Sequence, residues 1–196
     1  CNEYVYCTVC TAELSRKEDI EIPKLEKTSL AKATVSGIKD KTYTGKGTTQ
    51  NITVKLNGKT LEKGTDYMVS IKNWTDVGTA TLTVTGINAY SGSIKKTYKI
   101  NPKGTSLSKV TAGKKAFTAT WKKQTTKTTG YQIKYSTSSK FKNAKTVTVK
   151  KNKTTKTTVK KLKAKKKYYV RIRTYKTVGK KKYYSSWSKA KTVKTK

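Results

Sequence analysis

The three cysteines are the residues of this chain whose type and spacing point most directly to a chemical role. Cys7 and Cys10 are separated by two residues, a spacing that lets two thiolates bind one tetrahedral metal ion, and Cys1 could supply a third ligand. A structural zinc site needs four ligands, and the chain has no histidine to be the fourth. The cysteines therefore indicate either an incomplete zinc site, whose missing ligands belong to the intact protein, or a disulfide or free thiols in an oxidising compartment. No other cofactor is predicted.

Groups for catalysis are scarce in the rest of the sequence. Without histidine, the chain has no Ser-His-Asp or Cys-His system and no imidazole acid or base. The last of the ten Asp and Glu residues is Asp76, so residues 103–196 offer no carboxylate pair, carboxylate metal site or carboxylate base. We therefore predict that the chain is not an enzyme.

Positive charge is concentrated in the second half of the chain. Of 46 Lys and Arg residues, which give a formal net charge of +36, residues 103–196 hold 31. We predict that the two lysine triplets in this half bind polyanions: Lys165, Lys166 and Lys167, and Lys180, Lys181 and Lys182. Such a surface attracts anions strongly at low salt, with a screening length of about 8 Å at physiological ionic strength. The alternative is that it only keeps the protein soluble.

Several aromatic residues are candidates for exposed positions. Trp74, Tyr183 and Tyr184 are the candidate ligand-binding aromatics, and Tyr169 and Tyr175 also fall on the outward phase of their segment. These rings could stack on sugars or cover the stems of lysine and arginine side chains. The remaining aromatics mostly fall on the inward phase, and no helix or ribbon suited to a DNA groove is evident, so specific nucleic-acid binding is not predicted.

The elements that carry these residues are predicted to be β-strands. Apolar residues alternate with polar ones over short runs, which end at turn residues such as Asn57-Gly58, a strong hairpin signal. The inward residues of the second half form three such runs: Phe117, Ala119 and Trp121; Tyr131, Ile133 and Tyr135; and Tyr168, Val170, Ile172 and Thr174. No segment has a convincing helical period, and no apolar run approaches the roughly 20 residues of a membrane helix.

These patterns predict an all-β protein of two tandem immunoglobulin-like antiparallel β-sandwiches, preceded by a short Cys-containing segment. The boundaries follow from the charged stretch around Pro23 and from the linker at residues 101–104. We predict a Cys-containing tail of a preceding small repeat, with its linker, at 1–27, a first sandwich at 28–102 and a second sandwich at 103–196.

Residues 103–196 resemble a fibronectin type III domain. Trp121 ends a run like the family's second-strand tryptophan, and residues 130–135 (Gly-Tyr-Gln-Ile-Lys-Tyr) resemble its third strand. Leu162 and Tyr168 resemble the tyrosine corner, in which a tyrosine hydroxyl ties a loop to the sixth strand. Ser185-Ser186-Trp187-Ser188 resembles the final tryptophan motif, which implies that Trp187 stacks between Arg171 and Arg173. Lys165 and Lys166 depart from the family, which often has Pro or Gly before the corner tyrosine.

Residues 28–102 resemble a bacterial immunoglobulin-like repeat. The strings at 42–46 (Thr-Tyr-Thr-Gly-Lys), 63–67 (Lys-Gly-Thr-Asp-Tyr) and 77–80 (Val-Gly-Thr-Ala) carry this likeness, and Trp74 departs from it by replacing a residue that is usually small and polar. Residues 1–16 resemble the tail of a small cysteine-rich repeat, and the absence of an initial Met inside this motif suggests a fragment of a longer protein. The likeness implies a secreted or cell-wall-associated extracellular protein of a Gram-positive bacterium.

Two functions are consistent with this organisation. The first is a non-catalytic spacer or adhesion module whose basic last domain contacts anionic cell-wall or glycan polymers. The second is a module that binds a specific carbohydrate or protein ligand through its exposed aromatics. Sandwiches host many roles, so the fold by itself does not choose between them.

Overall fold

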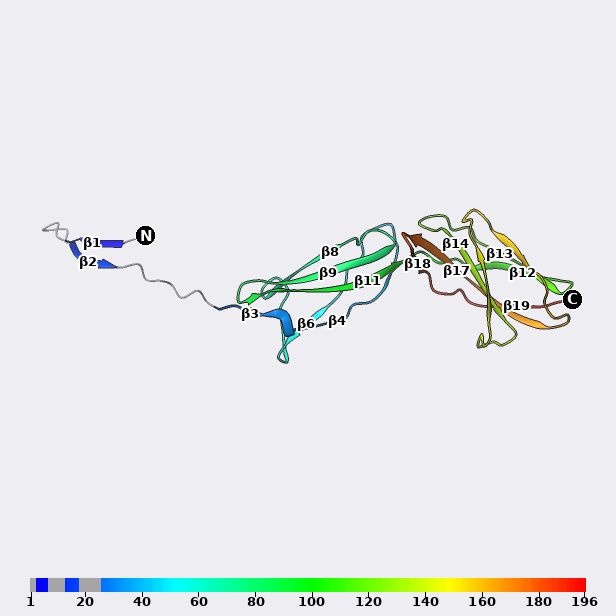
Figure 1. The fold of residues 1–196 in the computed structure, drawn as a ribbon, viewed down its shortest axis with the longest axis horizontal. Helices are drawn as coiled ribbons and strands as arrows, with labels where there is room; N and C mark the ends of the chain where they lie inside the picture. The colour runs from blue at the N-terminus through cyan, green and yellow to red at the C-terminus, as the bar shows by residue number, and fades with distance from the viewer. Residues whose placement is uncertain (1–2, 7–12, 18–25) are drawn as a thin grey trace.

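The computed structural model is built almost entirely of β-strands, as the sequence predicts (Figure 1). It describes residues 3–6, 13–17 and 26–196. Strands β1 (Glu3–Tyr6) and β2 (Glu13–Lys17) pair antiparallel, whereas Cys1, Cys7 and Cys10 lie outside the described residues. Within the described part, the one helical element is the short 3-10 turn η1 (Leu30–Lys32). No described helix is long and apolar enough to cross a membrane.

The first sandwich is built from strands β3 to β11. Its four-stranded sheet has the order β5-β11-β9-β8, its three-stranded sheet has the order β4-β6-β7, and β10 pairs with β3. The strand bounds are β3 (Thr28–Ser29), β4 (Thr34–Ser36), β5 (Lys41–Thr42), β6 (Thr53–Leu56), β7 (Lys59–Thr60), β8 (Tyr67–Lys72), β9 (Gly78–Gly86), β10 (Tyr90–Ser91) and β11 (Ser93–Asn101). The short pairs β10–β3 and β11–β5 are parallel, which is a departure from the purely antiparallel prediction.

The second sandwich is built from strands β12 to β19. One sheet has the order β12-β13-β16, and the other has the order β15-β14-β17-β18 with β19 also paired to β17. The strand bounds are β12 (Leu107–Gly113), β13 (Ala116–Trp121), β14 (Gly130–Ser136), β15 (Lys145–Val149), β16 (Lys156–Val159), β17 (Lys167–Val178), β18 (Lys181–Tyr184) and β19 (Lys191–Lys194). All pairings within it are antiparallel, as predicted.

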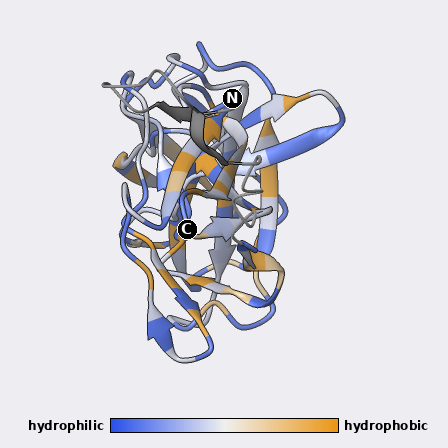
Figure 2. Ribbon diagram, turned by 90° about the vertical axis from the view of Figure 1, so that its left-hand side faces the viewer, coloured by the Kyte–Doolittle hydropathy of each residue, from blue (hydrophilic) through white to orange (hydrophobic). Residues whose placement is uncertain are grey.

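The predicted period of two is visible in the burial of individual strands. In β13, Phe117, Ala119 and Trp121 are buried and the residues between them are half-buried. Asn57 (φ 49°) and Gly58 (φ 82°) turn β6 into β7, and both positive φ values match the tight hairpin turn that this dipeptide favours. Figure 2 shows hydrophobic residues interrupting hydrophilic ones along the strands.

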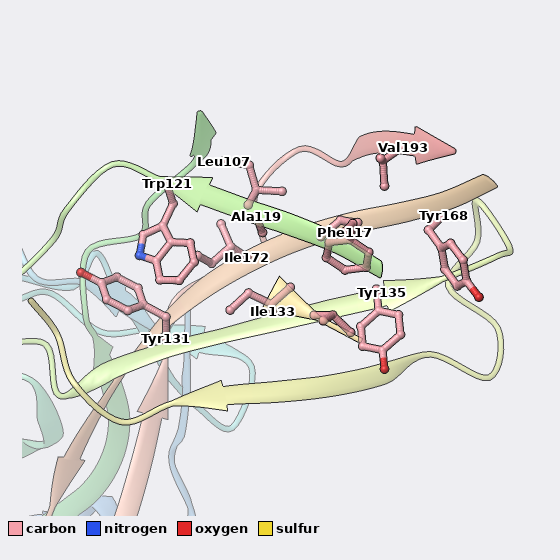
Figure 3. Packing of buried hydrophobic residues seen from close by; sticks show 12 residues of the cluster. Leu107, Phe117, Ala119, Trp121, Tyr131, Ile133, Tyr135, Tyr168, Ile172 and Val193 are labelled. Carbon is pink, nitrogen blue, oxygen red and sulfur yellow. The ribbon is translucent and has the colours of Figure 1, made fainter. Parts of the chain in front are cut away.

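The core of the second sandwich is rich in aromatic side chains (Figure 3). Phe117 meets the edge of Tyr135 at a centroid distance of 5.6 Å, and Trp121 lies 5.2 Å from Tyr131. Each fully buried aromatic of this kind contributes roughly 1.5–3 kcal/mol relative to exposure. The first sandwich has a smaller and more aliphatic cluster, with Leu30, Leu82 and Ile100 fully buried.

The linker at residues 101–104 is held by both sandwiches. Asn101 ends β11, and its carbonyl accepts a hydrogen bond from Tyr43 N–H in the first sandwich (2.8 Å). Pro102 is fully buried. The Thr174 hydroxyl of the second sandwich donates to the carbonyl of Lys103 (2.8 Å). The connection is therefore packed and hydrogen-bonded on both sides.

Candidate anion-binding surface

Strand β17 separates the two predicted lysine triplets. Lys165 and Lys166 precede its first residue, Lys167, whereas Lys180, Lys181 and Lys182 follow its last residue in the hairpin to β18. Twelve residues of extended strand span about 36 Å, at roughly 3.3 Å per residue. The six lysines therefore form two surfaces: a distal end around Lys165–Lys167 and a junction end around Lys180–Lys182, which faces the first sandwich.

The distal end contains a cavity of about 410 Å³ between the β14–β15 loop and the β16–β17 loop. Of the predicted lysines, only Lys166 lines it. Four lysines that the prediction did not single out also line the cavity: Lys142, Lys145, Lys161 and Lys163. The runs of lysine in the sequence did not reveal that these lysines lie together, because they come from two loops that only the folded sheet brings together.

The tyrosine corner that the resemblance implies is present beside this cavity. The Tyr168 hydroxyl accepts a hydrogen bond from the Lys163 N–H (3.2 Å), and the partly buried Leu162 packs against the core. Thr195 braces the same loop, because its hydroxyl donates to the Lys163 carbonyl (2.6 Å) and accepts from the Lys166 N–H (3.1 Å). The Lys-rich loop is therefore anchored although it lacks the Pro or Gly usual in the family.

Trp187 stacks between two arginines, as the resemblance also implies. The guanidinium carbons of Arg171 and Arg173 lie 5.1 and 4.3 Å from the centre of the Trp187 ring. The stack continues on both sides, with Phe141 over Arg171 at 4.0 Å and Tyr184 over Arg173 at 3.9 Å. The ring faces attract the guanidinium groups and partly replace the carboxylates that this half of the chain lacks.

The serines beside Trp187 complete the side of β17 that faces away from β14, in the gap between β18 and β19. The Ser185 hydroxyl accepts from Thr174 N–H and the Ser188 hydroxyl accepts from Ile172 N–H, both at 3.1 Å. Burial lowers the pKa of the Arg173 guanidinium, and Gln132 accepts two hydrogen bonds from it, at 2.9 and 2.7 Å. On this face both guanidinium groups are therefore stacked between rings, although the buried Nε of Arg171 has no hydrogen-bond partner among the described residues.

These features agree with the comparison with protein families. Residues 101–191 match the model of the fibronectin type III domain. This region is a fibronectin type III domain. No curated protein matches the sequence of the chain.

Two solved structures show how far the likeness extends. A beta-1,2-glucanase from Parabacteroides distasonis is 16% identical with a TM-score of 0.39, over 59% of this chain and 17% of the glucanase chain. The FN1-FN3 domains of chicken CNTN1 are 14% identical with a TM-score of 0.44, over 99% of this chain and 76% of that chain. The chain thus spans less than a fifth of the glucanase.

At the junction end, the fibronectin type III domain contacts the first sandwich through polar groups. The hydroxyls of Tyr183 and Thr79 lie 2.7 Å apart, and Lys127 forms an ion pair with Asp76 at 2.6 Å. The hydrogen bond from Lys127 is the main reason that the pKa of Asp76 is lowered, and the same bond raises the pKa of Lys127. The two sandwiches are therefore joined by more than their linker.

The candidate ligand aromatics have different environments. Trp74 is 39% exposed, and its ring packs over Gly47. Tyr183 is only 6% exposed, so its predicted exposure was wrong: the first sandwich covers it. Tyr175 was also predicted to face outward but is 3% exposed, because Gly130 lets its ring lie close to the backbone and Tyr184 packs against it. Tyr184 itself is half-buried on Arg173.

Metal binding can be assessed only where the structure describes the chain. Within residues 3–6, 13–17 and 26–196, no three Cys, Asp or Glu side chains lie together in a group that could hold a metal ion. The predicted ligands Cys1, Cys7 and Cys10 lie outside those residues. The choice between zinc and a disulfide at these cysteines stays a prediction.

Proposed function

We propose that the chain is a non-catalytic extracellular spacer and adhesion module of a larger bacterial surface protein, and that its fibronectin type III domain binds anionic cell-wall or glycan polymers. Fibronectin type III domains are commonly extracellular spacers or binding modules. The observation that carries the polymer-binding part is the charge of residues 103–196, with 31 basic side chains and no acid. Lys127 pairs with Asp76 of the first sandwich, but no Asp or Glu within residues 103–196 competes for the other cations, so external anions are their natural partners.

The junction supports the spacer part of this proposal. The two sandwiches follow one another along the long axis (Figure 1), and their linker contains the fully buried Pro102. The Asp76–Lys127 pair and the Tyr183–Thr79 contact add two links outside the linker. A linker that is buried and hydrogen-bonded restricts bending more than a solvated one does.

The origin and the domain limits are part of the same proposal. We assign residues 28–102 to a bacterial immunoglobulin-like repeat, residues 103–196 to the fibronectin type III domain and residues 1–27 to the tail of a cysteine-rich repeat with its linker, in a Gram-positive surface protein. The sequence strings in 42–46 and 63–67 support the first assignment. Metal analysis of the full chain, compared with a Cys7→Ser/Cys10→Ser variant, tests zinc against a disulfide at these cysteines.

Co-sedimentation of the full chain with purified Gram-positive cell walls tests the polymer-binding part. We expect binding at 50 mM NaCl that falls steeply by 500 mM, since the screening length shortens from about 14 Å to about 4 Å. Walls stripped of their anionic polymers are the matched control and should lose most of the binding. Absence of binding to intact walls at low salt would contradict the adhesion part and leave the spacer part.

A ligand-specific module is the second candidate function. The observation that favours it is the exposure of Trp74, which stands next to a cavity of about 440 Å³ lined by its neighbours Asn73 and Thr75 and by Val178 of the other sandwich. A glycan array with the full chain tests it. A hit that resists 500 mM salt and is lost in Trp74→Ala, but kept in Tyr184→Ala, would favour a junction ligand over diffuse charge.

A further inference from the structure

The cavity at the distal end of the fibronectin type III domain differs from the other hollows described on this domain in the number of lysines that line it, five against at most two. Its volume of about 410 Å³ lies within the range of small-ligand sites. Five lysines line it: Lys142, Lys145, Lys161, Lys163 and Lys166. The following argument rests on the proposed function and names the place and the chemistry of its anion contact.

No Asp or Glu side chain of this domain can neutralise these lysines. The last acid in the sequence is Asp76, in the first sandwich, and its partner Lys127 lies at the junction end. The cavity lies at the other end of β17, about 36 Å away at roughly 3.3 Å per residue. Five ammonium groups around one cavity repel one another, and an anion bound among them removes that repulsion.

Hydroxyl groups lie at the inner side of the cavity, together with the lysines. Tyr135 and Tyr168 line it, and Figure 3 shows both phenol oxygens pointing away from the core at this end. Burial is the main cause that raises the pKa of the Tyr135 hydroxyl, and the nearby Tyr168 raises it further. This hydroxyl therefore stays protonated at neutral pH. A protonated phenol can donate a hydrogen bond to an anion held by the lysines.

Hydrogen bonds hold both loops around the cavity in place. The Ser136 hydroxyl donates to the carbonyl of Lys142 (2.7 Å) in the first loop. In the second loop, the Thr195 hydroxyl donates to the carbonyl of Lys163, and Tyr168 accepts from its N–H. A site whose backbone is already ordered loses less conformational entropy when a ligand binds.

The backbone of the two loops has an unusual conformation. Of the nine non-glycine residues with positive φ in the described chain, four lie in these loops: Phe141 (55°), Asn143 (49°), Lys161 (60°) and Lys165 (51°). Phenylalanine and lysine ordinarily avoid this region, and residues held there are concentrated at functional sites. In this conformation the ring of Phe141 lies over the guanidinium group of Arg171, with 4.0 Å between the ring centre and the guanidinium carbon.

We propose that this cavity is a binding pocket for a phosphoryl group, carried as a phosphate ester or diester along an anionic polymer. Lys142, Lys163 and Lys166 are its main cationic donors, and Tyr135 adds a neutral one. A phosphoryl group fits this donor set because its oxygens accept several hydrogen bonds at once and lysine binds it as a point charge. In acidic glycans, by contrast, the carboxylates are separate groups along the polymer. They spread the same charge over a longer distance than a phosphoryl group does.

The test titrates the full chain with short-chain polyphosphate by calorimetry at 150 mM NaCl. We compare a pocket variant, Lys142→Gln/Lys163→Gln/Lys166→Gln, with a matched control, Lys180→Gln/Lys181→Gln/Lys182→Gln. Both lose three exposed charges, so diffuse attraction falls equally in the two. We expect the pocket variant to lose about tenfold or more in affinity and the control to lose about twofold.

A second variant keeps the proposal testable independently of charge. Tyr135→Phe preserves the ring and removes only the hydroxyl, and we expect a loss of about threefold in polyphosphate affinity with little change in thermal midpoint. Polyphosphate should also raise the thermal midpoint of the unmodified chain more than that of the pocket variant, because the pocket exists only in the folded state.

The outcomes separate this pocket from the proposed function. Equal losses in the pocket variant and the control would overturn the pocket, even if intact walls still bind. A tenfold difference without binding to walls would support the pocket and contradict the cell-wall assignment. The same titration is repeated with duplex DNA of equal charge. If DNA binds as tightly as polyphosphate and both variants weaken its binding equally, the attraction is diffuse and the pocket is overturned.

Discussion

The two sandwiches satisfy the same backbone requirements with different side chains. In the first sandwich, carboxylates accept from backbone N–H groups: Asp40 from Lys99 (2.7 Å) and Asp66 from Glu62 (2.8 Å). In the fibronectin type III domain, hydroxyls do so, as Ser188 does for Ile172. The acid-free composition of the second half is therefore compatible with its fold, because neutral acceptors replace carboxylates inside it.

The comparison extends to the surface cations. Lys127 finds its partner, Asp76, across the junction in the first sandwich. Arg171 and Arg173 instead stack on aromatic rings within their own domain. Within the described residues, the lysines of the distal cavity form neither an ion pair nor a cation–π contact, since that end is remote from every described acid of the first sandwich. This distribution of charge supports the proposal of an anionic partner outside the molecule.

The largest expected effect concerns the aromatic core, which is richer in rings in the fibronectin type III domain than in the first sandwich. Phe117→Ala should destabilise the fibronectin type III domain by about 3–5 kcal/mol. The substitution removes a fully buried ring that contacts Tyr135 and Tyr168, and this removal leaves a cavity. Urea unfolding monitored by far-UV circular dichroism measures the change. We expect two transitions, with the one assigned to the first sandwich unmoved. A single cooperative shift of the whole chain would show that the sandwiches do not unfold as separate units.

The next effect concerns the stacked cations. Trp187→Ala removes the ring between Arg171 and Arg173 and should cost about 2 kcal/mol, from two cation–π contacts and lost packing. Chemical denaturation quantifies it. Trp187→Phe is the control and should recover part of the loss, whereas equal instability of both variants would argue against a role for the ring face.

A smaller effect tests the exchange of carboxylates for hydroxyls. Ser188→Ala leaves the N–H of the fully buried Ile172 without its acceptor and should cost about 1–2 kcal/mol. Ser188→Thr keeps a hydroxyl and is the matched control. If alanine and threonine have the same stability in urea, the hydroxyl is not the group that satisfies this strand edge.

The smallest effect concerns the ion pair at the junction. Asp76 is half-exposed and its pKa is lowered chiefly by Lys127, so we expect Asp76→Asn to cost at most about 0.5 kcal/mol at pH 7. A lowered folded-state pKa stabilises the fold above the unfolded value of 3.8, and that contribution disappears as the pH falls through the folded-state value. Stability of the two proteins measured between pH 6 and pH 2.5 should therefore converge at the acid end. A constant difference across this range would contradict the assignment.

The alternation of apolar residues was enough to predict the strands, because side chains on a β-strand alternate between its two faces. It placed Phe117, Trp121 and Tyr168 in the core correctly. The same rule failed for Tyr175, which occupies an outward position but is covered by other groups. Tyr183 was expected to be exposed but pairs with Lys176, on the inward face of β17, where it contacts the first sandwich. Alternation describes one strand at a time and contains no information about what lies over its outer face.

The sequence by itself determined the all-β class and the turn at Asn57-Gly58, because both depend on local patterns, and its resemblance to a known family implied the tyrosine corner and the Trp187 stack. Only the tertiary structure decided which lysines lie together. The runs at Lys165–Lys167 and Lys180–Lys182 lie at opposite ends of β17, whereas Lys142 and Lys163 line one cavity from separate loops. Strand length and sheet pairing set these distances, and neither can be read from a run of like charges.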